Sequence, residues 1–273
     1  TDTRKMYHYN SSVTFEDDFT SDKSWVETGT QFTIDTSTNN RLDFALKRDG
    51  TEAFTTKDLT SVSDTAWVLR MHLNFTGKEN DDTYDHQTWF GLSSTNTNFM
   101  ATQDAIGLMV RWGNDNTFKA RDINGNNLDT AANNSQFTTS FTPTSEYWVE
   151  FIRVSSTSFT IELFSDSTYS TSVEKETVTT SSGVSGLRYI KATTRNSSSR
   201  SEIQNGYLDD VEFYNGVTTA TPITTWTSGS GIVATGGVEE TVGGYTYRKF
   251  ASSGTFAVTA GSGNLEVLIV GAG

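Results

Sequence analysis

Alternation of apolar and polar side chains is the feature that most constrains the fold of this chain. From Trp67 to Phe75, every second residue is large and apolar, whereas the residues between them include Arg70 and His72. A period of two is typical of a strand with one buried face, because successive side chains point to opposite sides. A helical period is almost absent from the chain, so strands must build its core.

Seven further segments show similar alternation: Gln87–Leu92, Ala105–Trp112, Thr117–Asp122, Tyr147–Val154, Phe159–Ser165, Leu187–Thr193 and Tyr207–Tyr214. Turn-forming residues separate these segments, and Asn124-Gly125 predicts a hairpin turn, since both residues tolerate a positive φ. About a dozen strands without helices predict an all-β fold, an antiparallel jelly-roll β-sandwich.

The distribution of glycine indicates a domain boundary. Eleven of the 22 glycines precede residue 223 and eleven follow it. We therefore predict a jelly-roll domain over residues 1–216, a linker over 217–224, and a small, truncated glycine-rich β module over 225–273. So short a module buries little area alone. Its apolar run Leu265–Val270 could accept a strand from a partner, which predicts possible self-assembly.

Charge and composition exclude several classes of function. The net charge is -13, with 20 basic and 33 acidic residues, which disfavours nucleic acid as a partner. No apolar run reaches the roughly 18 residues that a membrane span requires. Cysteine is absent, which excludes disulfides, thiolate metal sites and cysteine nucleophiles. The few charges and several Asn-x-Ser/Thr sites lead us to expect an extracellular, cell-surface or virion-surface location.

Specific motifs lie at the two ends of the first domain. The sequence reads FEDDF over residues 15–19 and LDDVEFYNG over 208–216, with WFGLSS at 89–94 between them. On these motifs, residues 12–216 resemble the concanavalin A-like lectin/glucanase jelly roll, in its laminin-G-like branch. The resemblance implies a two-sheet sandwich whose concave face often binds glycans, and a frequent structural Ca²⁺ near the chain ends. The tail is similar to glycine-rich modules of phage tail fibres and surface adhesins.

Carboxylates near both chain ends are candidate metal ligands. The predicted Ca²⁺ set is Glu16, Asp17, Asp209 and Asp210, with Asp18 beside it. Ca²⁺ takes six to eight oxygen ligands, and a cation would relieve the repulsion between carboxylates on adjacent first and last strands. The alternative is that these side chains alternate and are solvated at a sheet edge. The loop Glu79–Asp85 is a second candidate.

Glycan sites combine aromatic platforms with planar hydrogen-bonding side chains. The candidate set is Arg70, His72, Tyr84, Asp85, Trp89, Arg111 and Trp112, provided that their strands are adjacent. The alternative is that the tryptophans belong to the core. We expect this of Trp25, Trp67 and Trp148, and we expect at most one of Trp89 and Trp112 to face solvent.

Catalytic signals are absent or incomplete. Glucanases of the resembled family align Glu-x-Asp-x-x-Glu on one strand, which this sequence lacks, and Glu174 and Glu176 have no third acid. The Arg200-Ser201-Glu202 run is similar to a piece of jelly-roll alginate lyases but lies near the wrong end of the domain. We therefore predict a non-catalytic module that binds a glycan or cell-surface polysaccharide for adhesion. The alternatives are a structural subunit of a surface fibre, filament or coat, and a glycoside hydrolase or polysaccharide lyase.

Overall fold

The computed structural model describes residues 14–79, 86–113, 116–195, 199–218, 233–242, 245–250 and 253–260. The chain forms two compact units, of which the larger is His8–Pro222 and the smaller contains Ile223–Gly273. Within the described ranges every element is a strand, and no helix is long and apolar enough to cross a membrane. The predicted all-β fold class is confirmed.

One layer of the larger unit is an eight-stranded antiparallel sheet. Its order is β13-β12-β11-β6-β15-β4-β3, and β1 also pairs with β15. The strands are β1 (Phe15–Asp17), β3 (Phe32–Asp35), β4 (Arg41–Asp49), β6 (Trp67–Glu79), β11 (Glu146–Ser155), β12 (Ser158–Phe164), β13 (Ser172–Thr179) and β15 (Ser199–Asn215). The predicted alternating segment thus lies on β6, near the middle of this sheet.

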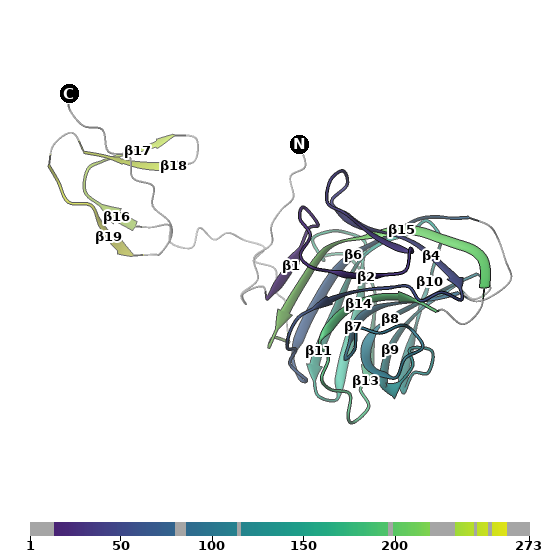
Figure 1. Cartoon of the computed structure of the whole chain (residues 1–273). Helices are drawn as coiled ribbons and strands as arrows, with labels where there is room; N and C mark the ends of the chain where they lie inside the picture. Colours follow the sequence, from purple (N-terminus) through teal and green to yellow (C-terminus); the bar gives the residue numbers. More distant parts are fainter. Residues whose placement is uncertain are drawn as a thin grey trace. The chain divides into compact units, whose positions relative to one another are not determined.

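The other layer is a seven-stranded antiparallel sheet of order β10-β9-β8-β7-β14-β5-β2. Its strands are β2 (Val26–Thr28), β5 (Phe54–Asp58), β7 (His86–Ser93), β8 (Gln103–Trp112), β9 (Thr117–Asn126), β10 (Asn133–Ser140) and β14 (Tyr189–Thr194). Together the two layers form the predicted sandwich (Figure 1).

The main hydrophobic core lies between the two sheets. Leu69 and Met71 of β6 belong to it and are fully buried, as are Phe90 of β7 and Leu108 of β8. These inward residues are every second residue of their strands, which leaves the intervening side chains on the outer faces. The predicted alternation is therefore confirmed as an inward and an outward face.

A second apolar cluster covers part of the outer face of the seven-stranded sheet. Trp89 of β7 and Met109 of β8 pack there with Phe99 and Leu128, which come from connecting segments. The Trp89 ring lies over Gly107, where an added Cβ would be only 2.8 Å from two ring atoms. Trp89 is consequently inaccessible to solvent although it lies outside the main core.

The predicted hairpin turn at Asn124-Gly125 is wrong. Both residues lie within β9, which continues to Asn126. Gly125 does adopt a left-handed conformation, with φ of +57°, beside a register irregularity between β8 and β9. The side chain of Asn124 donates to the carbonyl of Ser182 (3.0 Å). The positive φ of Gly125 thus accommodates an irregularity inside β9 and does not reverse the direction of the chain.

The smaller unit contains two short antiparallel pairs. β16 (Val233–Thr235) pairs with β19 (Ala257–Ala260), and β17 (Val238–Val242) pairs with β18 (Tyr245–Lys249). The run Leu265–Val270 lies outside the described residues, so self-assembly through it stays a prediction.

Candidate functional site

The outer face of the eight-stranded sheet carries charged and aromatic side chains near its centre. Arg70 and His72 of β6 point to this face, because Leu69 and Met71 beside them belong to the core. Both polar residues are nevertheless buried, with 2% and 7% of their surface exposed. Side chains from other elements must therefore cover them.

Arg70 is enclosed by acidic and aromatic neighbours. Glu150 of β11 and Glu212 of β15 lie opposite it in register on either side. The Nε of Arg70 donates to Glu150 Oε2 (2.5 Å), and the Tyr169 ring lies 3.9 Å from the guanidinium carbon. Burial raises the pKa of Glu150, although the Arg70 charge opposes this, and burial raises the pKa of Glu212 to about 7. Within this cluster Arg70 and Glu150 are buried, whereas Glu212 and Tyr169 are half-buried.

His72 is part of a row of ring systems. The indole of Trp148 stacks on its imidazole with ring centres 4.5 Å apart, and Tyr207 meets it edge-on at 5.5 Å. The Nε2 of His72 lies 2.8 Å from Glu146 Oε1. Burial lowers the pKa of His72, and the hydrogen bond and charge of Glu146 oppose that effect. Trp148 and Tyr207 therefore cover most of the His72 side chain, which contributes little exposed surface to this face.

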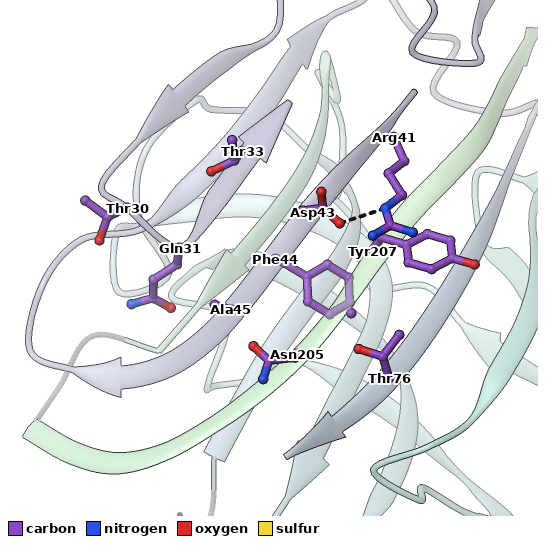
Figure 2. A pocket seen from close by; sticks show the side chains of 11 residues that line it. Thr30, Gln31, Thr33, Arg41, Asp43, Phe44, Ala45, Thr76, Asn205 and Tyr207 are labelled. Carbon is purple, nitrogen blue, oxygen red and sulfur yellow. Dashed lines mark hydrogen bonds and ion pairs between the residues drawn. The ribbon is translucent and has the colours of Figure 1, made fainter. Parts of the chain in front are cut away.

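A pocket of about 300 Å³ lies beside this row (Figure 2). The guanidinium carbon of Arg41 lies 4.2 Å from the centre of the Tyr207 ring, and its Nε donates to Asp43 Oδ1 (2.7 Å). The amide of Asn74 donates to the hydroxyl of Tyr207 (3.1 Å). The lining residues are Thr30, Gln31, Thr33, Arg41, Asp43, Phe44, Ala45, Thr76, Asn205, Gly206 and Tyr207.

The pocket is built mainly by strands. Arg41 and Asp43 on β4 alternate with the core residues Leu42 and Phe44, so both point to the outer face. Tyr207 of β15 lies directly opposite Asp43 in register. The pocket therefore combines a carboxylate, a guanidinium and a phenol ring held by paired backbone.

The seven predicted glycan-binding residues do not converge on one face. Arg70 and His72 belong to the eight-stranded sheet, whereas Trp89 and Arg111 lie on the outer face of the seven-stranded sheet. Trp112 is in the core, where it stacks against His86. Tyr84 and Asp85 lie outside the described residues. The predicted convergence is wrong for the described members, because β6 and the β7–β8 pair joined different sheets.

The predicted calcium ligands do not gather either. Asp17 is buried and accepts hydrogen bonds from Trp25 Nε1 (2.7 Å) and from the backbone N–H of Phe19 (2.8 Å). In the described part of the chain, Asp209 and Asp210 instead group with His72, with candidate ligand atoms within 4.8 Å of one another. A histidine nitrogen suits transition metals better than Ca²⁺, which prefers oxygen.

The remaining calcium candidates are not in that group. Glu16 lies opposite Glu212 in the pairing of β1 with β15. The second candidate loop, Glu79–Asp85, lies outside the described residues beyond Glu79. Calcium binding stays a prediction.

The acidic pair Glu174 and Glu176 has a structural role. The carboxylate of Glu174 accepts the backbone N–H groups of Thr138 (2.8 Å) and Thr139 (2.7 Å), so it joins β13 to β10 at the edge of the sandwich. These bonds lower the pKa of Glu174 to about 2. Glu176 also joins the two strands, because its carboxylate accepts a hydrogen bond from the side-chain hydroxyl of Ser135 on β10.

Sequence reasoning missed most of the pocket. Arg41 and Asp43 lie two residues apart in an alternating run, and this pattern was a usable signal, but nothing in the sequence pairs β4 with β15.

The tryptophan predictions were only partly correct. Trp148, expected in the core, lies half-buried on the outer face against His72. Trp25 and Trp67 are buried in the core as expected, and neither Trp89 nor Trp112 faces solvent.

The sequence matches no protein-family model and no curated protein. Among solved structures, a protein of unknown function from Shewanella oneidensis MR-1 is 12% identical with a TM-score of 0.50, over 76% of this chain and 88% of that one. This similarity concerns the fold alone.

Two further solved structures are similar at lower scores. The legume lectin-like domain from Entamoeba histolytica is 11% identical with a TM-score of 0.49, over 70% of this chain and 89% of that one. The CBM2 module of the evolved Dit of Lactobacillus casei BL23 phage J-1 is 10% identical with a TM-score of 0.44, over 74% and 97%.

Proposed function

We propose that the larger unit binds a carbohydrate in the Tyr207 pocket and does not alter it chemically. The observation that carries the proposal is the lining of the pocket: Arg41 and Asp43 are fixed to each other beside the Tyr207 ring, with Asn205 and Thr76 close by. Its volume of about 300 Å³ is at the lower end of small-molecule sites, which suits one or two sugar rings.

These groups match the chemistry of a sugar. The hydroxyls of a sugar donate and accept hydrogen bonds, and the Asp43 carboxylate, the Arg41 guanidinium and the Asn205 amide provide both kinds of partner. The Tyr207 ring offers an apolar surface to sugar C–H groups, and threonine hydroxyls complete the lining. Because Arg41 and Asp43 already bond each other, their charges are balanced before a ligand enters.

The pocket lining supports binding rather than catalysis. Glycoside hydrolysis normally needs two carboxyl groups that flank the scissile bond. Asp43 is the one acidic residue among the lining residues, and it bonds to Arg41. The paired acids of this sheet, Glu150 and Glu212, lie on either side of Arg70 and are not among the lining residues of the pocket. A binding role also fits the extracellular or surface location that the composition predicts.

A glycan array probed with the full chain tests the proposal. We expect Asp43→Asn and Asn205→Ala each to weaken glycan binding by about tenfold. Asp43→Asn replaces a charged acceptor by a neutral amide, and Asn205→Ala removes an amide from the pocket. Glu162→Gln is the matched control, since Glu162 lies on β12 of the same sheet and pairs with Lys175 away from the pocket (2.9 Å).

Two outcomes would contradict the proposal. Binding that survives both pocket substitutions would place the site elsewhere, and a chain that binds no glycan would remove the function. Incubation of a bound oligosaccharide with the wild-type protein checks the absence of catalysis. Shorter products in a mass spectrum would favour the hydrolase or lyase alternative.

A further inference from the structure

Three arginines lie close together on the outer face of the seven-stranded sheet. Arg111 of β8, Gln87 of β7 and Arg195, which follows β14, occupy successive positions across adjacent strands: Arg111 pairs with Gln87, and the N–H of Arg195 donates to the carbonyl of Gln87 (3.0 Å). Arg121 of β9 approaches the same region. We call Arg111, Arg121 and Arg195 the arginine cluster.

Asp129 contacts two members of the arginine cluster, Arg195 through its carboxylate and Arg121 through its backbone carbonyl. Its Oδ2 is 2.9 Å from Arg195 Nη2, and its backbone carbonyl accepts a hydrogen bond from Arg121 Nη1 (3.3 Å). Burial lowers the pKa of Arg121, and the nearby Arg111 charge lowers it further, whereas Asp129 opposes this. Arg121 and Arg111 are thus close enough to repel each other, and the Asp129 carboxylate forms an ion pair with Arg195.

Several buried polar atoms at this place have no hydrogen-bond partner among the described residues. They are the Nε atoms of Arg121 and Arg195 and the Oε1 atom of Gln87. Gln87 is more than nine-tenths buried, and it lies between Arg111 and Arg195. Buried polar groups are normally satisfied. These atoms are themselves inaccessible, so a ligand would meet the partly exposed guanidinium groups around them, such as that of Arg195, whose side chain is 22% exposed.

We propose that the arginine cluster binds the carboxylate or sulfate group of an acidic polysaccharide. The planar guanidinium group presents paired donors that match the two oxygens of such an anion. Duplex nucleic acid fits less well, because it carries one charge per about 1.7 Å of its axis and is repelled by a chain of net charge -13, whereas a uronic acid chain carries only about one charge per sugar.

Binding of defined polymers to the full chain tests this site. The probes are polygalacturonate, which carries carboxylates, dextran sulfate, and uncharged dextran, with binding measured by biolayer interferometry. We expect one or both acidic polymers to bind, dextran to fail, and binding to weaken as salt is raised. The two acidic arms show which anion the cluster prefers.

Substitutions localise the binding. Arg195→Gln and Arg121→Gln should each weaken it by about tenfold, since each removes charge-assisted hydrogen bonds. Arg195 is partly exposed at the end of β14, so its variant keeps the test valid if Arg121→Gln fails to fold. The matched control is Arg188→Gln, which removes an equal charge where Arg188 pairs with Asp58 (2.7 Å). Binding by this control should stay within about twofold of wild type.

Two more variants separate this site from its surroundings. Asp129→Asn should tighten binding, because the carboxylate that competes for the arginines is removed. Glu162→Gln should leave it unchanged, because Glu162 lies on the other sheet, where it pairs with Lys175 (2.9 Å). The proposal is overturned if neither acidic polymer binds, if Arg188→Gln weakens binding as much as Arg195→Gln, or if Asp129→Asn abolishes it.

Discussion

The carboxylate of Asp17 joins two segments near the start of the larger unit. One oxygen accepts the indole N–H of Trp25, and the other accepts the backbone N–H of Phe19, whose φ of +53° is left-handed. We expect Asp17→Ala to lower the free energy of unfolding by about 1–3 kcal/mol, because two buried donors lose their acceptor. Urea denaturation in calcium and in chelator should give equal losses. A loss confined to the calcium buffer would show that Asp17 is a metal ligand after all.

Glu212 should make folding depend on pH near neutrality. Burial raises its pKa from 4.5 to about 7, so the folded protein holds this proton more tightly than the unfolded chain does. Its contribution to stability is therefore complete below about pH 4.5 and is lost as the pH rises through 7. Compared with Glu212→Gln, the wild type should gain stability between pH 8 and pH 5, as measured by urea denaturation at each pH. A constant difference between the two proteins would refute the assignment.

Residue identity alone did not show which polar side chains are accessible. Arg70 and His72 were correctly placed on a non-core face by the alternation of β6. Tyr169 and Trp148, which cover them, come from segments some 75 to 100 residues further along the chain. Such coverage depends on tertiary packing, which a local pattern does not contain.

Close packing of β7 on β8 requires the glycine at position 107. A Cβ there would lie 2.4 Å from the carbonyl oxygen of Phe90 and 2.8 Å from the Trp89 ring. We expect Gly107→Ala to cost about 3 kcal/mol in unfolding free energy, because both neighbours are fixed in the sheet. Gly125→Ala is the comparison: no atom lies within 4 Å, so only its positive φ is penalised, by about 1 kcal/mol. Equal losses in thermal or urea unfolding would contradict this ranking.

Strand positions were largely predictable, whereas strand partners were not. The expected runs 105–112 and 147–154 fall within β8 and β11. Which sheet each strand joins depends on pairing over long sequence separations, such as β6 with β15. This is why one predicted binding face was divided between the two layers of the sandwich.

At the scale of the whole molecule, the periodicity of apolar residues predicted the fold class, whereas composition did not predict the sites. The scarcity of helical periodicity and the abundance of alternating runs were sufficient for the all-β sandwich. The net charge of -13 describes an average, and it gave no sign that arginines gather around Asp129. Local departures from the average composition emerged only when distant strands were brought together.

The construction of the Tyr207 pocket from paired strands bears on how its specificity can change. A slip of one residue between β15 and β4 would turn Tyr207 and Asn205 to the opposite side, and the pocket would vanish in a single step. An insertion or deletion of one residue in these strands would therefore disrupt the pocket unless a β-bulge absorbed it, as the irregularities of β15 do in its pairing with β6. We expect homologous chains to differ mainly by substitution of the side chains that line the pocket. The backbone of β4 and β15 should then stay the same while the chemistry of the lining changes.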